Sequence, residues 1–399
     1  MFRPLKNIRV LDLTNVLAGP FCCHQLAHMG AEVIKVENPE GGDLARRLGA
    51  SPELNDNDMG VSFLAQNTGK KSITINLKSR RGGSLFEELV RTADVVVENF
   101  RPGVMRRLGL DYEHLKSLNP ELVYCAISGF GQDGPLHDLP AYDQIIQGMS
   151  GVMSITGDEH SSPCRVGYPV ADTIGGLTGA FAISAALAKP KPGRGVFIDV
   201  SMLESVLATM GWVVSNYLVA GRAPCPMGNN NFTASPSGSF RTGNGIINIA
   251  ANKQEQFEAV CDVTGVPELK RDPRFRTRQA RLENRGALQD LLEERLAERS
   301  AGEWLEALGR KNVPSGPIFS VPEILAHPQV AGRGLIGEFD RVSGVSGPVR
   351  FVKTGIRFDG QSPDTGSPPP RLGEHSQEIM EELGYRPAQI DAMKEENVI

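Results

Sequence analysis

The chain has 399 residues, which is enough for two or three domains and too long for one small module. Its 44 glycines and 27 prolines exceed average usage, but 40% hydrophobic and 22% charged residues exclude collagen and disorder and are typical of a globular protein. The formal net charge of only -5 gives no overall electrostatic support for a nucleic-acid partner.

The first half of the chain alternates predicted strands and helices. Apolar runs rich in β-branched residues predict strands at 8–14 and 31–37, with a helix after Gly19-Pro20 between them. Further strands are predicted at 72–78, 95–100, 122–131 and 197–202, and further helices around 85–90 and at 175–188, the latter ended by KPKPGRG at 189–195. Because parallel strands need crossover helices, this order predicts a Rossmann-like α/β domain with a parallel sheet covered on both faces.

The pattern changes near residue 221. Residues 221–238 are rich in Gly, Pro and Asn and predict a long loop, and 239–250 predict a hairpin around Asn244-Gly245. Helices are expected near 253–262, 279–298 and 301–310, and the tail carries strands near 349–358 and a last helix near 374–385. We therefore expect a large α/β domain over 1–200, a linker helix or loop over 201–224, a small α+β domain over 225–325, and a C-terminal part over 326–399 that returns to the large domain.

No targeting segment, membrane span or metal site is predicted. The start runs directly into a strand pattern, and the longest mostly apolar stretch, 175–188, falls short of the ~20 residues that span a bilayer. The cysteines lack a C-x-x-C pair, which argues against a disulfide framework or a zinc site: Cys22, Cys23, Cys125, Cys164, Cys225 and Cys261. His24 and His28 find no further ligand in the sequence. We expect a cytoplasmic protein without a membrane partner.

The common nucleotide and hydrolase signatures are missing from the sequence. The first strand-helix turn reads NVLAGP where a dinucleotide site needs G-x-G-x-x-G, and NTGKKS at 67–72 lacks the first glycine and the Ser or Thr of a phosphate loop. No G-x-S-x-G elbow, H-E-x-x-H helix or calcium loop occurs. Polar residues in apolar surroundings are therefore the remaining candidates.

Asp172 in PVADTIGG is the foremost of these candidates. It follows apolar residues and precedes a glycine-rich helix, so it lies at or just before a helix N-terminus. One interpretation is an N-cap whose carboxylate accepts hydrogen bonds from the first amides of the helix. The other is a carboxylate nucleophile, accessible because Gly175 and Gly176 have no side chains.

Ordered motifs extend over nearly the whole chain: IRVLDLTNVLAGP at 8–20, GAEVIKVENPEGGD at 30–43, NTGKKSITINLK at 67–78, VVVENFRPGVMRRLGL at 95–110, SGFGQDGP at 128–135, AYDQIIQGMSG at 141–151, PVADTIGG and RLGEHSQEIMEELGY at 371–385. In content and order these motifs resemble those of the class III CoA-transferase family, which also contains the α-methylacyl-CoA racemases. Within the family, VLDLTNVLAGPF and INIAANKQEQF at 247–257 look most like the members that move CoA from succinyl-CoA to dicarboxylates such as glutarate, itaconate, mesaconate or citramalate.

The resemblance implies that Asp172 is the nucleophile of a covalent CoA transfer. CoA and acyl-CoA are then substrates, and no permanently bound cofactor is implied. Because the thioester is conserved, water must be excluded. The oxyanions need backbone amides, for which we consider the small residues around Gly19, Gly148 and the 229–235 loop.

The resemblance also implies a set of CoA contacts. Arg101 and Arg107 stand where the family places cations, and Arg suits phosphate groups. Tyr142 stands at a family active-site tyrosine. The remaining matches to family CoA contacts are Val16, Ala18, Ile75, Lys78, Asn99 and Phe100.

Departures from the family pattern narrow the range of expected substrates and reactions. The oxalate-directed members have a glutamine at the place of Leu17, an arginine at that of Asn38, and a run of glycines where this chain has NNNFTAS at 229–235. Those differences argue against oxalate and formyl-CoA. Racemases have a histidine where this chain has Tyr142, and a tyrosine with a pKa near ~10 is a poor acid/base at neutral pH.

Several alternatives stay open at this point. Arg46, Arg47 or Arg165 could bind the distal carboxylate of a dicarboxylate. The chain could instead be an acyl-CoA racemase or epimerase, or a non-catalytic acyl-CoA-binding homologue. The resemblance further implies an interlocked homodimer whose active site lies at the subunit interface.

Overall fold

The structure is a computed structural model that describes residues 2–188 and 194–399. Most of the predicted helix-ending segment at 189–195 therefore lies outside the described residues. Contacts group the described residues into two compact units. The first comprises those of Met1–Val152, Arg165–Arg222 and Gln329–Ile399, and the second those of Met153–Cys164 and Ala223–Pro328. The predicted boundaries assign residues 153–164 to the large domain, whereas the contacts group them with the second unit.

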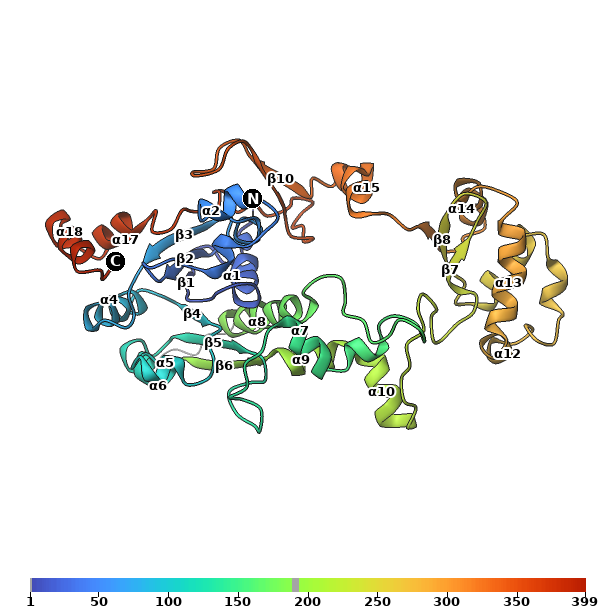
Figure 1. Cartoon of the computed structure of the whole chain (residues 1–399), viewed down its shortest axis with the longest axis horizontal. Helices are drawn as coiled ribbons and strands as arrows, with labels where there is room; N and C mark the ends of the chain where they lie inside the picture. Colours follow the sequence, from blue (N-terminus) through green and yellow to red (C-terminus); the bar gives the residue numbers. More distant parts are fainter. Residues whose placement is uncertain (1, 189–193) are drawn as a thin grey trace. The chain divides into compact units, whose positions relative to one another are not determined.

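A six-stranded sheet forms the centre of the first unit (Figure 1). Its order is β3-β2-β1-β4-β5-β6, and every neighbouring pair is parallel. The strands are β1 (Arg9–Asp12), β2 (Glu32–Glu37), β3 (Lys70–Thr74), β4 (Val95–Glu98), β5 (Val123–Ser128) and β6 (Val196–Ser201). All residues of β4 and β5 are buried, as expected for strands that are covered on both faces. The predicted α/β class with a parallel sheet is confirmed.

Helices cover both faces of this sheet and form two separate apolar clusters with it. One cluster contains α4 (Arg80–Val90), α6 (Tyr112–Leu118), α17 (Ser376–Glu382) and α18 (Pro387–Glu395), and the other α1 (Ala18–His28), α8 (Val170–Ala188) and α9 (Met202–Thr209). The C-terminal helices are tied to β3 and the loop after it, because His375 N donates to Ser72 O at 2.9 Å and Asn76 N to Val398 O at 2.8 Å. Residues near both ends of the chain thus share one core.

Helix α8 is longer than the sequence predicts, since it begins at Val170 instead of Gly175. Among the described residues it is the one single helix that is long and apolar enough to cross a membrane, and the bent pair α9 and α10 (Gly211–Ala220) passes only if counted as one span. Its glycines, however, pack against the rest of the unit: a Cβ on Gly176 would lie 2.5 Å from Ala18 O. This packing buries one side of α8 within the unit.

The second unit has its own small sheet and apolar core. The order β7-β8-β9 is antiparallel, and Trp304 and Phe257 are buried beneath it among the helices. The elements are β7 (Ser237–Arg241), β8 (Ile246–Ala250), α11 (Gln254–Val263), α12 (Arg278–Glu283), α13 (Arg285–Leu296), α14 (Ala301–Arg310) and β9 (Ser315–Pro317). The predicted hairpin around Asn244-Gly245 is present as β7 and β8.

Three predicted elements have different bounds in the structure. The strand predicted at 72–78 is β3, which ends at Thr74 because the chain turns at Asn76, whose carbonyl accepts from Ser79 N. The helix predicted at 279–298 is interrupted at Asn284, with φ -109° and ψ 30°. The helix predicted near 374–385 is α17, which ends before Gly384, whose φ is +90°, and α18 follows it as a helix that was not predicted from the sequence. Side-chain periodicity alone does not reveal such backbone breaks.

Candidate active site

The candidate site lies where the strand order of the sheet reverses. The chain moves outward from β1 to β2 and β3, then returns to β4 on the other side of β1. In open α/β sheets this switch point leaves a crevice at the carboxyl ends of the strands, where ligands bind. A cavity of about 170 Å³ occurs there. It is lined by Asn15, Val16, Leu17, Ala18, Asn99, Phe100, Ile127, Ser128, Gly129, Ala141, Tyr142, Asp172 and Met202.

Asp172 lines this cavity from the first turn of α8 but does not cap the helix. That function belongs to Asp143, at the start of α7 (Asp143–Met149), whose Oδ1 accepts from Ala171 N at 2.9 Å and from Asp172 N at 3.3 Å. Gln147 holds Asp143 in turn, with Nε2 2.7 Å from Oδ2. The N-cap interpretation of Asp172 is therefore wrong, and its carboxylate is not engaged by the helix amides.

The surroundings of Asp172 disfavour its charged form. Burial, followed by the nearby Asp143 carboxylate, raises the pKa of Asp172 to about 7. A carboxylate with few stabilising partners is a stronger nucleophile than a solvated one, and perturbed carboxyl groups in a cavity mark candidate catalytic residues. At neutral pH a large fraction of Asp172 is ionised and can react.

The turn after β1 forms the wall of the cavity next to Asp172. Asn99, just after β4, fixes this turn by two hydrogen bonds with Asn15: it accepts from Asn15 N at 2.8 Å and donates to Asn15 O at 2.9 Å. Val16 has a φ of +67°, a left-handed conformation that costs a β-branched residue roughly 1–2 kcal/mol. The amides of Leu17 and Ala18 follow, at the N-terminus of α1, where helix amides lack intrahelical partners.

Buried ion pairs lie beneath this turn. Lys35 Nζ is 2.9 Å from Asp43 Oδ2, and Lys70 Nζ is 2.8 Å from Asp12 Oδ2, with all four side chains fully buried. Burial alone would raise the pKa of Asp12, but Lys35 and Lys70 outweigh it and lower that pKa. The pairs are therefore charged, and they surround the backbone between Asp12 and Pro20, since Lys35 also donates to Thr14 O and Lys70 to Pro20 O.

The structure brings together six of the ten residues predicted for the site. Asp172, Val16, Ala18, Asn99, Phe100 and Tyr142 all line the cavity, although Tyr142 is 68% exposed. Lys78, Arg101 and Arg107 are exposed and lie outside the cavity lining. Ile75 is only 1% exposed and packs in the core with α4, so its side chain is not at a surface that CoA could reach.

The three arginines considered for a distal carboxylate have different environments. Arg46 is fully buried in a two-pronged ion pair with Glu37, with both nitrogen-oxygen distances at 2.7 Å, and its guanidinium stacks on Phe63. It is a structural residue and cannot bind a substrate. Arg47 pairs with Asp58 at 2.8 Å at the surface, and Arg165 is exposed.

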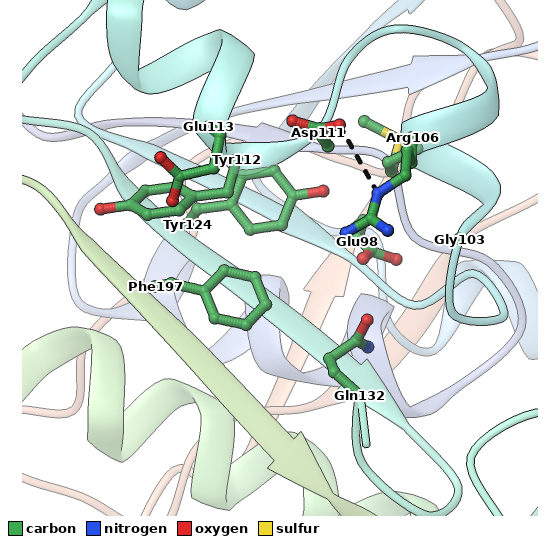
Figure 2. A pocket seen from close by; sticks show the side chains of 10 residues that line it. Glu98, Gly103, Arg106, Asp111, Tyr112, Glu113, Tyr124, Gln132 and Phe197 are labelled. Atoms are coloured by element: carbon green, nitrogen blue, oxygen red, sulfur yellow. Dashed lines mark ion pairs between the residues drawn. The ribbon is translucent and has the colours of Figure 1, made fainter.

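A second cavity, of about 220 Å³, lies on β4, β5 and β6 beside α6 (Figure 2). Tyr112, Tyr124 and Phe197 form an aromatic cluster there with ring centroids 5.4–5.9 Å apart. Burial raises the pKa of Glu98 to about 8, and Glu98 Oε2 accepts from Phe100 N at 2.7 Å. Glu98 thus supports the loop after β4 from this side.

Two residues that hold the backbone around the cavity were not singled out from the sequence. Asp143 is adjacent to Tyr142 in AYDQ, but its capping of α8, 28 positions away, depends on tertiary structure. Asp43 ends the EGGD motif, and its contact with Val16 spans 27 positions. The only available signal was an acidic residue inside a motif of the resemblance. In the described residues, no group of three or more potential metal ligands occurs and all six cysteines are free.

Comparisons with known proteins identify the family of this chain. The model of CoA-transferase family III matches residues 5–376. The chain is 39% identical to the succinate–glutarate CoA-transferase of Agrobacterium fabrum, over 95% of this chain and 96% of that protein. It is 41% identical to the acetyl-CoA:oxalate CoA-transferase of Acetobacter aceti, over 87% and 89%. The crystal structure of a CAIB/BAIF family protein from Brucella suis superposes with a TM-score of 0.82 at 36% identity, covering 96% of this chain and all of that one.

The family match spans most of the chain, both relatives exceed 30% identity over nearly their full lengths, and Asp172 lies at the switch point of the sheet. This chain therefore belongs to CoA-transferase family III.

Proposed function

We propose that this enzyme moves CoA from succinyl-CoA to a dicarboxylic acid, with Asp172 as the covalent nucleophile. The observation that carries the proposal is a half-buried carboxylate that lines a cavity at the sheet's switch point while another residue, Asp143, caps its helix. A carboxylate that does not cap its own helix is available for a covalent step.

In the proposed reaction, an oxygen of Asp172 attacks the thioester carbon of the donor. The carbon-sulfur bond breaks, CoA leaves as the thiolate, and a mixed anhydride remains. The thiolate then attacks the aspartyl carbonyl carbon and releases the donor acid, which leaves an aspartyl-CoA thioester. The acceptor carboxylate attacks this thioester and releases the thiolate again, and the thiolate attacks the acceptor's carbonyl in the new anhydride, which regenerates Asp172.

The turn after β1 suits the charge that develops in these steps. Each attack places negative charge on a carbonyl oxygen, which backbone amides stabilise. We assign this role to the amides of Leu17, the N-cap of α1, and Ala18, its first residue, since both residues line the cavity with Asp172. Contributions from Gly148 or from the 229–235 loop stay predictions.

The side chain of Leu17 bears on the acceptor acid. Relatives of similar identity are named for glutarate and for oxalate, so overall similarity does not separate these acids. Leu17 lines the cavity, and its apolar side chain can donate no hydrogen bond to the second carboxylate of oxalate, which lies one bond from the first. An apolar contact instead suits the methylene groups of a longer dicarboxylate such as glutarate.

We further propose that the exposed cations Lys78, Arg101 and Arg107 contact the phosphates of CoA, while Val16, Ala18, Asn99, Phe100 and Tyr142 surround its thioester end. The cavity of about 170 Å³ accommodates an acyl group but not a whole CoA, which supports binding of the remainder across the surface. A cytoplasmic location also stays a prediction.

The exposed apolar side chains of the first unit support a homodimer. Phe181 on α8 is 76% exposed, and Leu218 and Val219 on α10 are 74% and 87% exposed. Side chains of this size gather at the surface where another protein surface covers them. We propose that a second copy of this chain, interlocked with the first, is that partner.

Incubation with succinyl-CoA and hydroxylamine tests the nucleophile. We expect the wild-type enzyme to be inactivated and to carry a hydroxamate on Asp172, which peptide mass spectrometry detects. In a separate assay without hydroxylamine, we expect the enzyme to transfer CoA to glutarate faster than to oxalate. Asp172→Ala should lose transfer to both acids by at least 10³-fold, since no other carboxylate replaces the nucleophile. Asp133→Ala, an exposed carboxylate, serves as the control.

Other outcomes favour the other functions. Retained transfer in Asp172→Ala contradicts the covalent mechanism. Deuterium incorporation at the α-carbon of the acyl group without any acceptor indicates a racemase or epimerase. Tight CoA binding without exchange indicates a non-catalytic homologue.

A further inference from the structure

Val16 has an unusual backbone conformation for its residue type. Its φ of +67° lies in the left-handed region, which Asn and Asp tolerate and β-branched residues avoid. Apart from Val16, the described non-glycine residues with positive φ are all Asn or Asp: Asn7, Asp58, Asn312, Asp359 and Asn397. Such a conformation persists only where surrounding contacts hold it.

Asp43 supplies the contact that holds Val16. Its Oδ1 accepts from Val16 N at 2.9 Å and from Ala45 N at 2.9 Å. Its Oδ2 lies 2.9 Å from Lys35 Nζ, and Lys35 also donates to Thr14 O at 2.7 Å. Asp43 and Lys35 thus attach the turn on both sides of Asn15.

The position of this pair keeps the turn in place. Both side chains are fully buried, so no water competes for the hydrogen bonds. A short helical turn at 44–47 begins directly after Asp43, and Arg46 within it is locked to Glu37. The carboxylate is therefore fixed from several directions.

We propose that Asp43 is a positioning residue for the Asp172 site: together with Lys35 it holds the turn at Val16 in the conformation that shapes the cavity wall and aims the amides of Leu17 and Ala18. This inference rests on the proposed function of Asp172. It assigns to the buried ion pair an effect on turnover that is separate from its effect on stability.

Asp43→Asn tests the inference, because the asparagine keeps an acceptor oxygen for Val16 N but lacks the negative charge that pairs with Lys35. We expect kcat to fall at least tenfold while KM for succinyl-CoA changes less than threefold. Val16→Gly should partly rescue this variant, since glycine adopts positive φ without strain. The double variant Val16→Gly/Asp43→Asn should have at least threefold higher kcat than Asp43→Asn alone.

Asp94→Asn is the matched control. Asp94 also accepts from a backbone amide, Arg9 N at 2.8 Å, but at the amino ends of the strands, opposite the site. Its substitution should lower the midpoint of thermal unfolding and leave kcat within twofold of wild type. If Asp43 had only a structural role, both Asp43→Asn and Asp94→Asn would lower the unfolding midpoint, and neither would change kcat.

Either of two results would overturn the inference: kcat of Asp43→Asn within twofold of wild type, or no rescue by glycine at position 16. If Asp43→Asn does not fold, hydrogen exchange of the wild-type enzyme decides, since an amide of Val16 that exchanges rapidly is not held by a buried carboxylate. If Asp172→Ala stays active, the proposed function fails. If Asp172→Ala is inactive and Asp43→Asn is normal, only the role of Asp43 fails.

Discussion

Two carboxylates only 29 positions apart lie at the start of α8 and make different contacts. Asp143 accepts hydrogen bonds from the first amides of the helix, whereas Asp172, in the first turn, lines the cavity. An aspartate can serve either as a helix cap or as a nucleophile, and its hydrogen-bond partners distinguish the two functions. Asp172 was identified from its motif, whereas the capping of its helix by Asp143 required the structure.

The raised pKa of Asp172 predicts how the rate depends on pH. Because burial and Asp143 raise that pKa to about 7, the ionised nucleophile is scarce below pH 6 and predominant above pH 8. We expect kcat/KM to rise with pH through about 7 and then level off, as measured by CoA transfer between pH 5.5 and 9. A rate that falls over this range would contradict the assignment.

Asp143→Asn provides the matched variant for this pH profile. The amide keeps an oxygen for the helix amides but removes the negative charge beside Asp172. The charge contributes to the raised pKa after burial, so its loss should move the midpoint of the profile to lower pH. An unchanged midpoint would leave burial as the sole cause.

At the level of elements, the contact between α8 and α1 positions the two sides of the cavity. Gly176 allows this contact because any side chain there would meet the backbone: its Cβ would lie 2.5 Å from Ala18 O. The glycine-rich start of α8 therefore serves helix packing, in addition to the access to Asp172 that the sequence indicated.

Gly176→Ala should lower the free energy of unfolding by about 1–3 kcal/mol, as overpacking does. It should also reduce kcat, because it displaces the first turn of α1 beside Asp172. Gly83→Ala in α4 is the control, since its added Cβ would meet no atom within 4 Å beyond its chain neighbours and the adjacent helix backbone, and helix propensity favours alanine by up to about 1 kcal/mol. Chemical denaturation measures both, and equal stability of the two variants would contradict the packing argument.

At the level of the whole molecule, the exposed apolar faces of α8 and α10 predict an assembly. Sedimentation of the wild-type enzyme should give about twice the 43.1 kDa of one chain, without folded monomers on dilution. Phe181→Asp should weaken the dimer because it places a charge in an apolar contact, and Phe181→Leu should not. A stable, active monomer would exclude the proposed assembly.

The sequence by itself determined the α/β class and the family resemblance, since strand patterns and ordered motifs are local properties of the chain. It also indicated Asp172 as the candidate nucleophile, which stays a proposal. It left Arg46 open as one of three possible substrate ligands, because the paired Glu37 is recognisable only once β2 and the turn at 44–47 are folded together. Likewise, the predicted contact of Ile75 meets a core position.

Only the tertiary structure decided how the site is assembled. The strand order places the loops after β1 and β4 side by side, so that Asn99 reaches Asn15 across 84 positions and Asp43 reaches Val16 across 27. Such contacts depend on the reversal of strand order and on the burial of charges in pairs. Both properties depend on residues far apart in the sequence, so they cannot be predicted from residue types and their local spacing.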